Sequence, residues 1–132
     1  MDYLVGLSLA FALLGSSTVI GFDRDRVLYP IMLIVIASYY VLFAAMGAST
    51  RALILDGVAA GVFVVAAVIG FRFRLWLVVA ALVGHGIFDF VHQDIIGNPG
   101  VPDWWPGFCL AFDGVAAGYL AVLLTRRPAL AG

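Results

Sequence analysis

Long apolar runs separated by short polar links dominate this chain. Five runs, each roughly 20 residues long, are continuous rather than alternating, and a helix of that length crosses about 30 Å of hydrocarbon. The continuity excludes the alternating strands of a membrane barrel, so helices are the remaining way to satisfy the backbone in lipid. The pattern predicts transmembrane helices over Tyr3–Phe22, Val27–Gly47, Ala52–Gly70, Leu75–Ile96 and Gly107–Thr125.

Short links between these helices predict an all-α membrane protein, a single domain over 1–132 built as a compact five-helix bundle. The hexapeptide Asp56–Gly61 recurs letter for letter as Asp113–Gly118. This echo favours a duplicated hairpin, with the second and third helices as one copy and the fourth and fifth as the other. Coincidence remains an alternative, because glycine, valine and alanine are common in membrane helices.

Each hexapeptide also contains a GxxxG pair, Gly57/Gly61 and Gly114/Gly118. Small residues one turn apart let two helix backbones approach closely. The favoured interpretation is helix packing within the chain, and a homodimer through one of these faces is the alternative.

Composition supports the membrane class. Of the 132 residues, 64% are hydrophobic and 11% are charged, against about 45–50% and about 25% in soluble domains. A soluble fold of this size could not bury so much apolar surface, and disordered chains lack it. The net charge of −1 provides no basic face for nucleic acid. The lipid bilayer is therefore the expected partner.

Arginine sets the expected orientation. With five spans, the first link, the third link and the C-terminus share one side, and that side carries all arginines except Arg51. Cytoplasmic links are enriched in Lys and Arg. We therefore expect a bacterial inner-membrane protein with its N-terminus outside and its C-terminus in the cytoplasm. Trp104 and Trp105, in the long link Gly97–Pro106, would then lie at the outer interface.

Charged and imidazole side chains inside the spans are the strongest functional signal, because such groups are costly in lipid. His85, Asp89 and His92 fall within one helical stripe about 60° wide. Asp56 and Asp113 lie near the outer ends of the third and fifth helices. Counting residues from the predicted helix ends places Asp89, His92, Asp56 and Asp113 within roughly 6–11 Å of the outer boundary, with His85 one turn deeper.

This residue set fits a divalent metal site. Imidazole and carboxylate together suit zinc first, with iron or manganese as alternatives. The predicted metal ligands are Asp89, His92, Asp113 and Asp56. The predicted catalytic or supporting groups are His85, as a metal-supporting partner or proton relay, and Tyr39 or Tyr40, which could donate a proton or position substrate. Competing interpretations are a core histidine at 85, a helix cap or an Arg51 partner at Asp56, and a metal-free Asp89–His92 pair.

The leading hypothesis is a metal-dependent, hydrolase-like enzyme acting on a lipid or small amphiphile from the outer leaflet. The alternatives are a cation- or proton-coupled small transporter and a structural subunit with a metal-free buried polar network. No GxSxG, HExxH or phosphate loop is present.

The runs GHGIFDFVH, PDWWPGFC and FDGVAAGYL resemble a pattern in small bacterial integral membrane proteins of unassigned function. The likeness covers most of the second to fifth predicted helices, and it implies a fold and a location but no activity. The His85–Asp89–His92 stripe is also similar to that of membrane metallohydrolases of the alkaline ceramidase type. Those proteins have more helices and further histidines on other spans, which this chain lacks.

Overall fold

A computed structural model describes residues 1–132 and confirms the predicted all-α fold, with five helices long and apolar enough to cross a membrane. Helix α5 begins at Trp105, earlier than the predicted Gly107, because proline at 106 fits the first turn of a helix. Two short elements at one end were not predicted. The elements are α1 (Asp2–Ile20), η1 (Phe22–Arg24), α2 (Leu28–Met46), α3 (Thr50–Arg72), α4 (Trp76–Ile95), α5 (Trp105–Arg126) and α6 (Pro128–Ala131).

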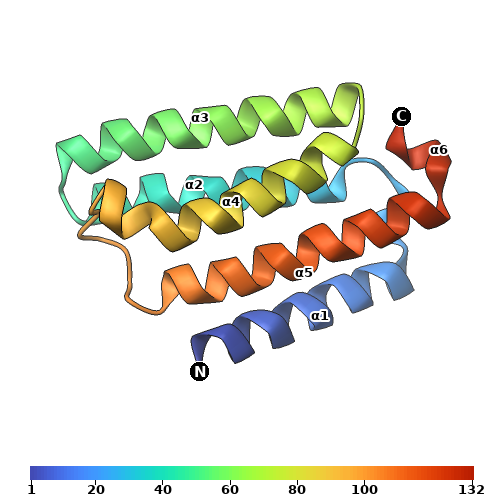
Figure 1. The fold of residues 1–132 in the computed structure, drawn as a ribbon, viewed down its shortest axis with the longest axis horizontal. Helices are drawn as coiled ribbons and strands as arrows, with labels where there is room; N and C mark the ends of the chain where they lie inside the picture. The colour runs from blue at the N-terminus through green and yellow to red at the C-terminus, as the bar shows by residue number, and fades with distance from the viewer.

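The five long helices run side by side along the long axis of the molecule (Figure 1). The hairpins α2–α3 and α4–α5 pack as predicted, α1 lies against α5, and α4 contacts α3 on its other side. One end, here called the loop end, holds the α2–α3 and α4–α5 links. The opposite end, here called the arginine-rich end, holds η1, the α3–α4 turn and the C-terminus, and it carries Arg24, Arg26, Arg72, Arg74, Arg126 and Arg127.

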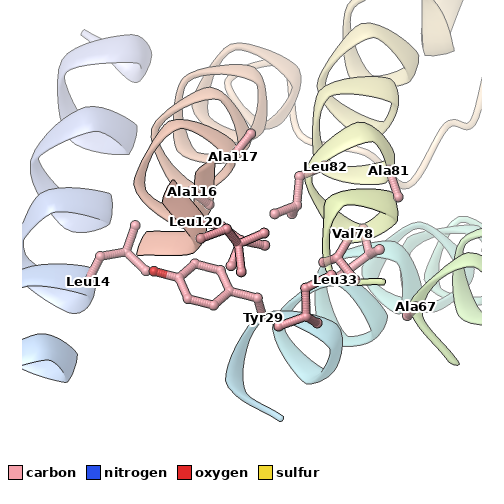
Figure 2. Packing of buried hydrophobic residues seen from close by; sticks show 12 residues of the cluster. Leu14, Tyr29, Leu33, Ala67, Val78, Ala81, Leu82, Ala116, Ala117 and Leu120 are labelled. Carbon is pink, nitrogen blue, oxygen red and sulfur yellow. The ribbon is translucent and has the colours of Figure 1, made fainter. Parts of the chain in front are cut away.

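The apolar core lies toward the arginine-rich end, where leucine, valine and alanine side chains from all five long helices meet (Figure 2). Leu14, Leu33, Leu82 and Leu120 are completely buried there. Many large apolar side chains instead point outward, while the interior also holds carboxylates and imidazoles. Lipid is as apolar as leucine, so close packing and interior polar bonds hold such a bundle together rather than exclusion from water.

Two glycines allow backbones to meet where a side chain would not fit. A Cβ on Gly6 would overlap the carbonyl oxygen of Phe108, which brings α1 directly onto the start of α5. A Cβ on Gly100 would overlap the carbonyl oxygen of Phe43, so the α4–α5 link lies against the end of α2. The contact at Gly100 holds the link over the loop end of the bundle.

The expectation that the GxxxG glycines pack helices within the chain is wrong. A Cβ added at Gly57, Gly61, Gly114 or Gly118 would meet no atom within 4 Å. The aspartate that opens each hexapeptide faces the interior, and the next residue lies about 100° further around the helix. The glycines therefore face outward on α3 and α5.

Side chains also close the helix ends. The Ser49 hydroxyl accepts a hydrogen bond from the Ala52 amide at 3.2 Å and caps α3. At the arginine-rich end, Arg26 donates to the carbonyl oxygens of Phe71 and Leu130, each at 2.7 Å. A guanidinium beside unpaired carbonyls at a helix C-terminus is favourable, because those carbonyls carry the negative end of the helix dipole.

Candidate functional site

The predicted stripe on α4 faces the interior along its whole length. His85, Asp89 and His92 are each 0% exposed, whereas Ile87 and Phe90, between them in sequence, are 59% and 71% exposed. The spacings of four and three residues keep the polar side chains on one helix face. Helix α4 therefore presents a continuous polar face to α2, α3 and α5.

The deeper part of the site joins α4 to α5. Nδ1 of His85 lies 2.7 Å from Oδ2 of Asp113 and 3.3 Å from Oδ2 of Asp89. One ligand atom from each of these three residues lies within 4.8 Å of the other two. Ligands bound at about 2.0–2.2 Å to one ion lie roughly 3.0–3.6 Å from each other. This group, here called the His/Asp/Asp group, could hold one metal ion after small adjustments of its side chains.

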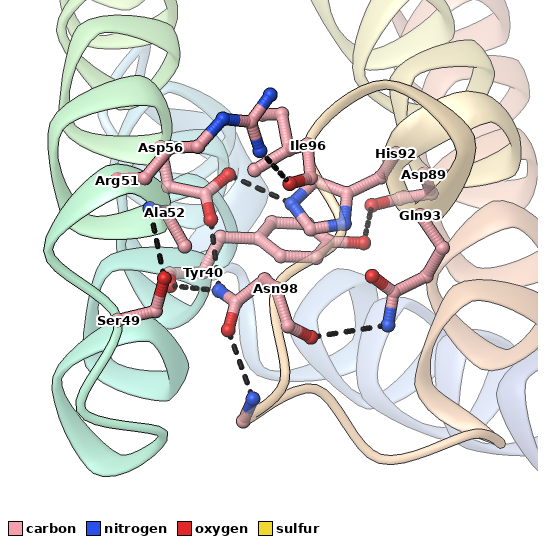
Figure 3. Close-up of polar contacts among 11 residues, drawn as sticks. Tyr40, Ser49, Arg51, Ala52, Asp56, Asp89, His92, Gln93, Ile96 and Asn98 are labelled. Atoms are coloured by element: carbon pink, nitrogen blue, oxygen red, sulfur yellow. Dashed lines mark hydrogen bonds and ion pairs between the residues drawn. The ribbon is translucent and has the colours of Figure 1, made fainter.

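The shallower part of the site joins α4 to α3. Nε2 of His92 lies 2.7 Å from Oδ1 of Asp56, and the Asn98 amide donates to Oδ2 of Asp56 at 2.8 Å (Figure 3). Asn98 also donates to the carbonyl oxygen of Tyr40 at 3.1 Å and accepts from the Gly100 amide at 3.0 Å. The α4–α5 link thereby contributes a buried side chain that completes the partners of Asp56.

Tyr40 on α2 connects the two parts. Its hydroxyl donates to Oδ1 of Asp89 at 2.5 Å. Its ring stacks on the His92 ring, with centroids 4.1 Å apart and planes inclined by 27°. The network therefore runs from Asp113 through His85, Asp89 and Tyr40 to His92 and Asp56, and it draws on four helices.

Four buried polar atoms in this network have no hydrogen-bond partner: Nε2 of His85, Oδ2 of Asp89, Nδ1 of His92 and Oδ1 of Asp113. Buried polar atoms are normally paired, because leaving one unpaired costs about 1–3 kcal/mol and more for charged groups. Three of these atoms belong to the His/Asp/Asp group. A cation there would interact favourably with both carboxylates.

The predicted site residues do not all meet at one place in the structure. The four predicted metal ligands divide between two places, with Asp89 and Asp113 in the His/Asp/Asp group and Asp56 paired with His92. His85, predicted as a supporting group, lies among the candidate ligands. Tyr40 belongs to the network, whereas Tyr39 is 38% exposed. Roles for all seven residues stay predictions.

The competing interpretations of Asp56 are also decided by the geometry. Ser49 caps α3, and Asp56 lies well inside that helix with 1% exposure. Arg51 donates instead to the Ile96 carbonyl oxygen at 2.5 Å. Asn98 is the network member that sequence reasoning missed, and its position in an Asn-Pro-Gly turn was its only signal.

An apolar groove of about 480 Å³ runs between α1, α2 and α5 beside the site. Tyr39, Trp105 and Cys109 line it, and Trp105 and Cys109 also pack against Tyr40. Trp105 is only 9% exposed and contacts the Tyr39 ring edge-on at 5.0 Å, whereas Trp104 is 48% exposed. One layer of side chains thus separates the groove from the polar network.

The fold and this site define a class: a multi-span membrane protein with a buried His/Asp/Asp group whose ligand atoms could hold a metal ion. Comparison with protein-family models, curated proteins and solved structures found no match for the chain. Its function is therefore argued from the site alone.

Proposed function

We propose that this protein is a metal-dependent membrane enzyme, hydrolase-like in chemistry, that acts on a lipid or small amphiphile. One observation carries the proposal. His85, Asp89 and Asp113 come from two helices, are each 0% exposed, and place their ligand atoms within 4.8 Å of one another. Burying two carboxylates together is costly unless a cation or donors compensate for them.

The donor set points to the kind of metal. One imidazole nitrogen with carboxylate oxygens suits zinc, iron or manganese better than the all-oxygen preference of magnesium or calcium. We favour zinc. Three protein ligands leave a coordination position open, as in catalytic zinc sites, and a divalent ion bound there supplies a Lewis acid that activates water for hydrolysis.

The surrounding residues would support this chemistry. The Tyr40 hydroxyl orients Asp89 through its 2.5 Å hydrogen bond, as groups behind a metal ligand commonly do. Asp56 and Asn98 hold His92 beside the Tyr40 ring. The free Nδ1 of His92 would then transfer a proton during hydrolysis.

The apolar groove supports an amphiphilic substrate. Its lining is apolar throughout, and its volume of about 480 Å³ fits an acyl chain. Its wall of Trp105 and Cys109 lies against Tyr40, so movement of this wall would bring a scissile bond to the network. Zinc could not act on a bond that stayed outside this layer, so the reaction requires that opening.

Metal content is the first test. The purified protein is loaded separately with zinc, iron(II) or manganese, desalted, and measured by elemental analysis. We expect about one zinc per chain in the wild type, and less than a tenth of that in His85→Gln and Asp113→Asn. Asp94→Asn, which changes an exposed carboxylate on the same helix, should retain zinc. Wild-type protein that binds none of the three metals contradicts the proposal and supports the structural-subunit alternative.

Activity is the second test, using p-nitrophenyl esters of short, medium and long acyl chains in mixed micelles. We expect zinc-dependent hydrolysis that increases with chain length. Leu13→Trp, which narrows the groove, should remove the preference for long chains, whereas Leu9→Trp changes an exposed leucine of α1 outside the groove. Hydrolysis that His85→Gln leaves unchanged would arise from a contaminant and would count against the enzyme.

A proton- or cation-coupled transporter is the second candidate, and the continuous network from Asp113 to Asp56 favours it. The apolar core argues against a transporter. Leu33, Leu82 and Leu120 are fully buried between the network and the arginine-rich end, so an ion would meet apolar side chains on that path. Proton flux into liposomes, abolished by Asp89→Asn without bound metal, would favour the transporter.

The proposal includes the expected location in a bacterial inner membrane, with the loop end outside. Arginine at the other end supports this orientation. A homodimer also stays a prediction, and the outward-facing Gly57 and Gly61 on α3 support it. Labelling of single cysteines introduced at Asp103 and Arg72 in intact cells, in a Cys109→Ala background, tests the orientation.

A further inference from the structure

A second pocket lies at the arginine-rich end, far along the bundle from the His/Asp network. It has a volume of about 560 Å³ and lies between α1, η1 and the last turns of α5. Its lining combines apolar, uncharged polar and charged side chains. The lining includes Phe11, Asp23, Gly118, Val122, Arg126 and Arg127.

Asp23 is the unusual member of this pocket. It is 2% exposed, and the Thr18 hydroxyl donates to its Oδ2 at 2.8 Å. Its Oδ1 has no hydrogen-bond partner, and no cationic side chain forms an ion pair with it. A buried carboxylate oxygen of this kind favours a donor, and a positively charged donor most strongly.

Two arginines supply the opposite charge at the same pocket. Arg126 and Arg127 are exposed, and neither forms an ion pair with an acid of this chain. Guanidinium groups bind phosphate through paired hydrogen bonds. The pocket therefore combines a site for a cation at Asp23 with a site for an anion at the arginines.

The remaining lining is shaped for an apolar chain. Phe11 on α1 and Val122 on α5 line the pocket, and Gly118 lies beside them. A Cβ on Gly118 would meet no atom within 4 Å, so the absence of a side chain leaves the space open. An occupant that matches this lining carries an ammonium, a phosphate and a hydrocarbon chain.

We propose that this pocket binds an aminophospholipid with a phosphoethanolamine headgroup, its primary ammonium on Asp23, its phosphate on Arg126 and Arg127, and an acyl chain along Gly118. Basic pockets between transmembrane helices are known places for lipid headgroups. The primary amine matters, because a quaternary choline cannot donate a hydrogen bond to Oδ1 of Asp23. This site is independent of the metal proposal.

Native mass spectrometry of the full chain tests the site, with ethanolamine, choline and glycerol phospholipids of identical acyl chains. We expect the ethanolamine lipid to bind about tenfold more tightly than the choline lipid, because only it makes the charged hydrogen bond. Asp23→Asn should abolish this preference, while Asp25→Asn, an exposed acid two residues away, should preserve it. Soluble phosphoethanolamine should bind far more weakly, because it lacks the chain.

A second pair of variants tests the pocket without altering charge. Gly118→Leu fills the chain position, and Gly61→Leu makes the same change at the matching glycine of the other hexapeptide, outside the pocket. We expect Gly118→Leu alone to lower ethanolamine-lipid binding by about tenfold or more. Equal binding of ethanolamine and choline lipids, tighter binding of the glycerol lipid, or equal effects of the two leucines would each overturn the proposal.

Discussion

Removing the Tyr40 hydroxyl separates a metal site from a merely polar interior more cleanly than removing a ligand does. Tyr40→Phe keeps the ring that stacks on His92 and deletes only the donor to Oδ1 of Asp89. Loss of a partner that orients a metal ligand typically weakens metal binding by about 10–100-fold. We therefore expect zinc to bind this variant with an affinity lower by that factor.

The size of the effect on stability follows from binding linkage. Free zinc at 100 times the dissociation constant stabilises a protein by about 2.7 kcal/mol. A 30-fold weaker site at the same concentration is stabilised by only about 0.9 kcal/mol, so zinc should stabilise the variant by about 2 kcal/mol less. Without zinc, loss of a hydrogen bond to a charged group should lower stability by a further ~1.5–3 kcal/mol.

The assay combines zinc competition against a chromophoric chelator with unfolding measured with and without zinc. Tyr39→Phe is the matched control, because it removes a neighbouring hydroxyl on the same helix that points away from the network. We expect the control to retain wild-type affinity. Wild-type zinc affinity in Tyr40→Phe, or equal losses in both variants, would refute the assignment of Asp89 as a ligand.

Three further predictions concern the site and its scaffold. His92→Gln should retain about one zinc per chain by elemental analysis, and loss of all zinc would instead place His92 among the ligands, as the sequence predicted. Ser49→Ala should lower the free energy of unfolding by about 1 kcal/mol, measured by denaturant titration in micelles, through loss of the α3 cap. Gly6→Leu should detach α1 from α5, because its side chain would overlap Phe108; protease cleavage near residue 22 should then accelerate, and unchanged cleavage would contradict this packing.

The spans could be predicted because the thickness of hydrocarbon limits helix length, so the apolar runs and the helices agree within a few residues. The network could be predicted in outline because charges inside spans are rare and costly. The hydrogen-bond partners within the network could not be predicted. A stripe shared by His85, Asp89 and His92 leaves open which neighbour meets which residue, since that depends on how α3 and α5 are rotated against α4.

Two misjudged features have a common physical cause. Asn98 was overlooked and the glycines of the hexapeptides were expected at packing positions, because residue type alone does not show which side of the backbone is covered. Trp105 shows the same dependence on direction, because it lies at the start of α5 and turns inward against Tyr39. Each error concerns the direction of a side chain rather than the presence of an element.

The repeated hexapeptide places one aspartate on each of two helices that face α4. Asp56 and Asp113 open the two copies, and each bonds a different histidine of the same helix, at 2.7 Å in both cases. Helices α3 and α5 run in the same direction on either side of α4, and His85 and His92 are two turns apart. The pair His85–Asp113 lies within the α4–α5 hairpin, whereas the pair His92–Asp56 joins that hairpin to α3, so the repeat matches the two aspartates but not their histidine partners.

The two pairs then differ in what surrounds them. The pair at His85 has a second carboxylate, Asp89, and no side-chain amide, which leaves it suited to a cation. The pair at His92 has Asn98, whose amide already satisfies the second oxygen of Asp56. Because one pair has a surplus of carboxylate and the other has donors on both oxygens of its aspartate, our proposal assigns the metal to the His85 pair and proton transfer to His92.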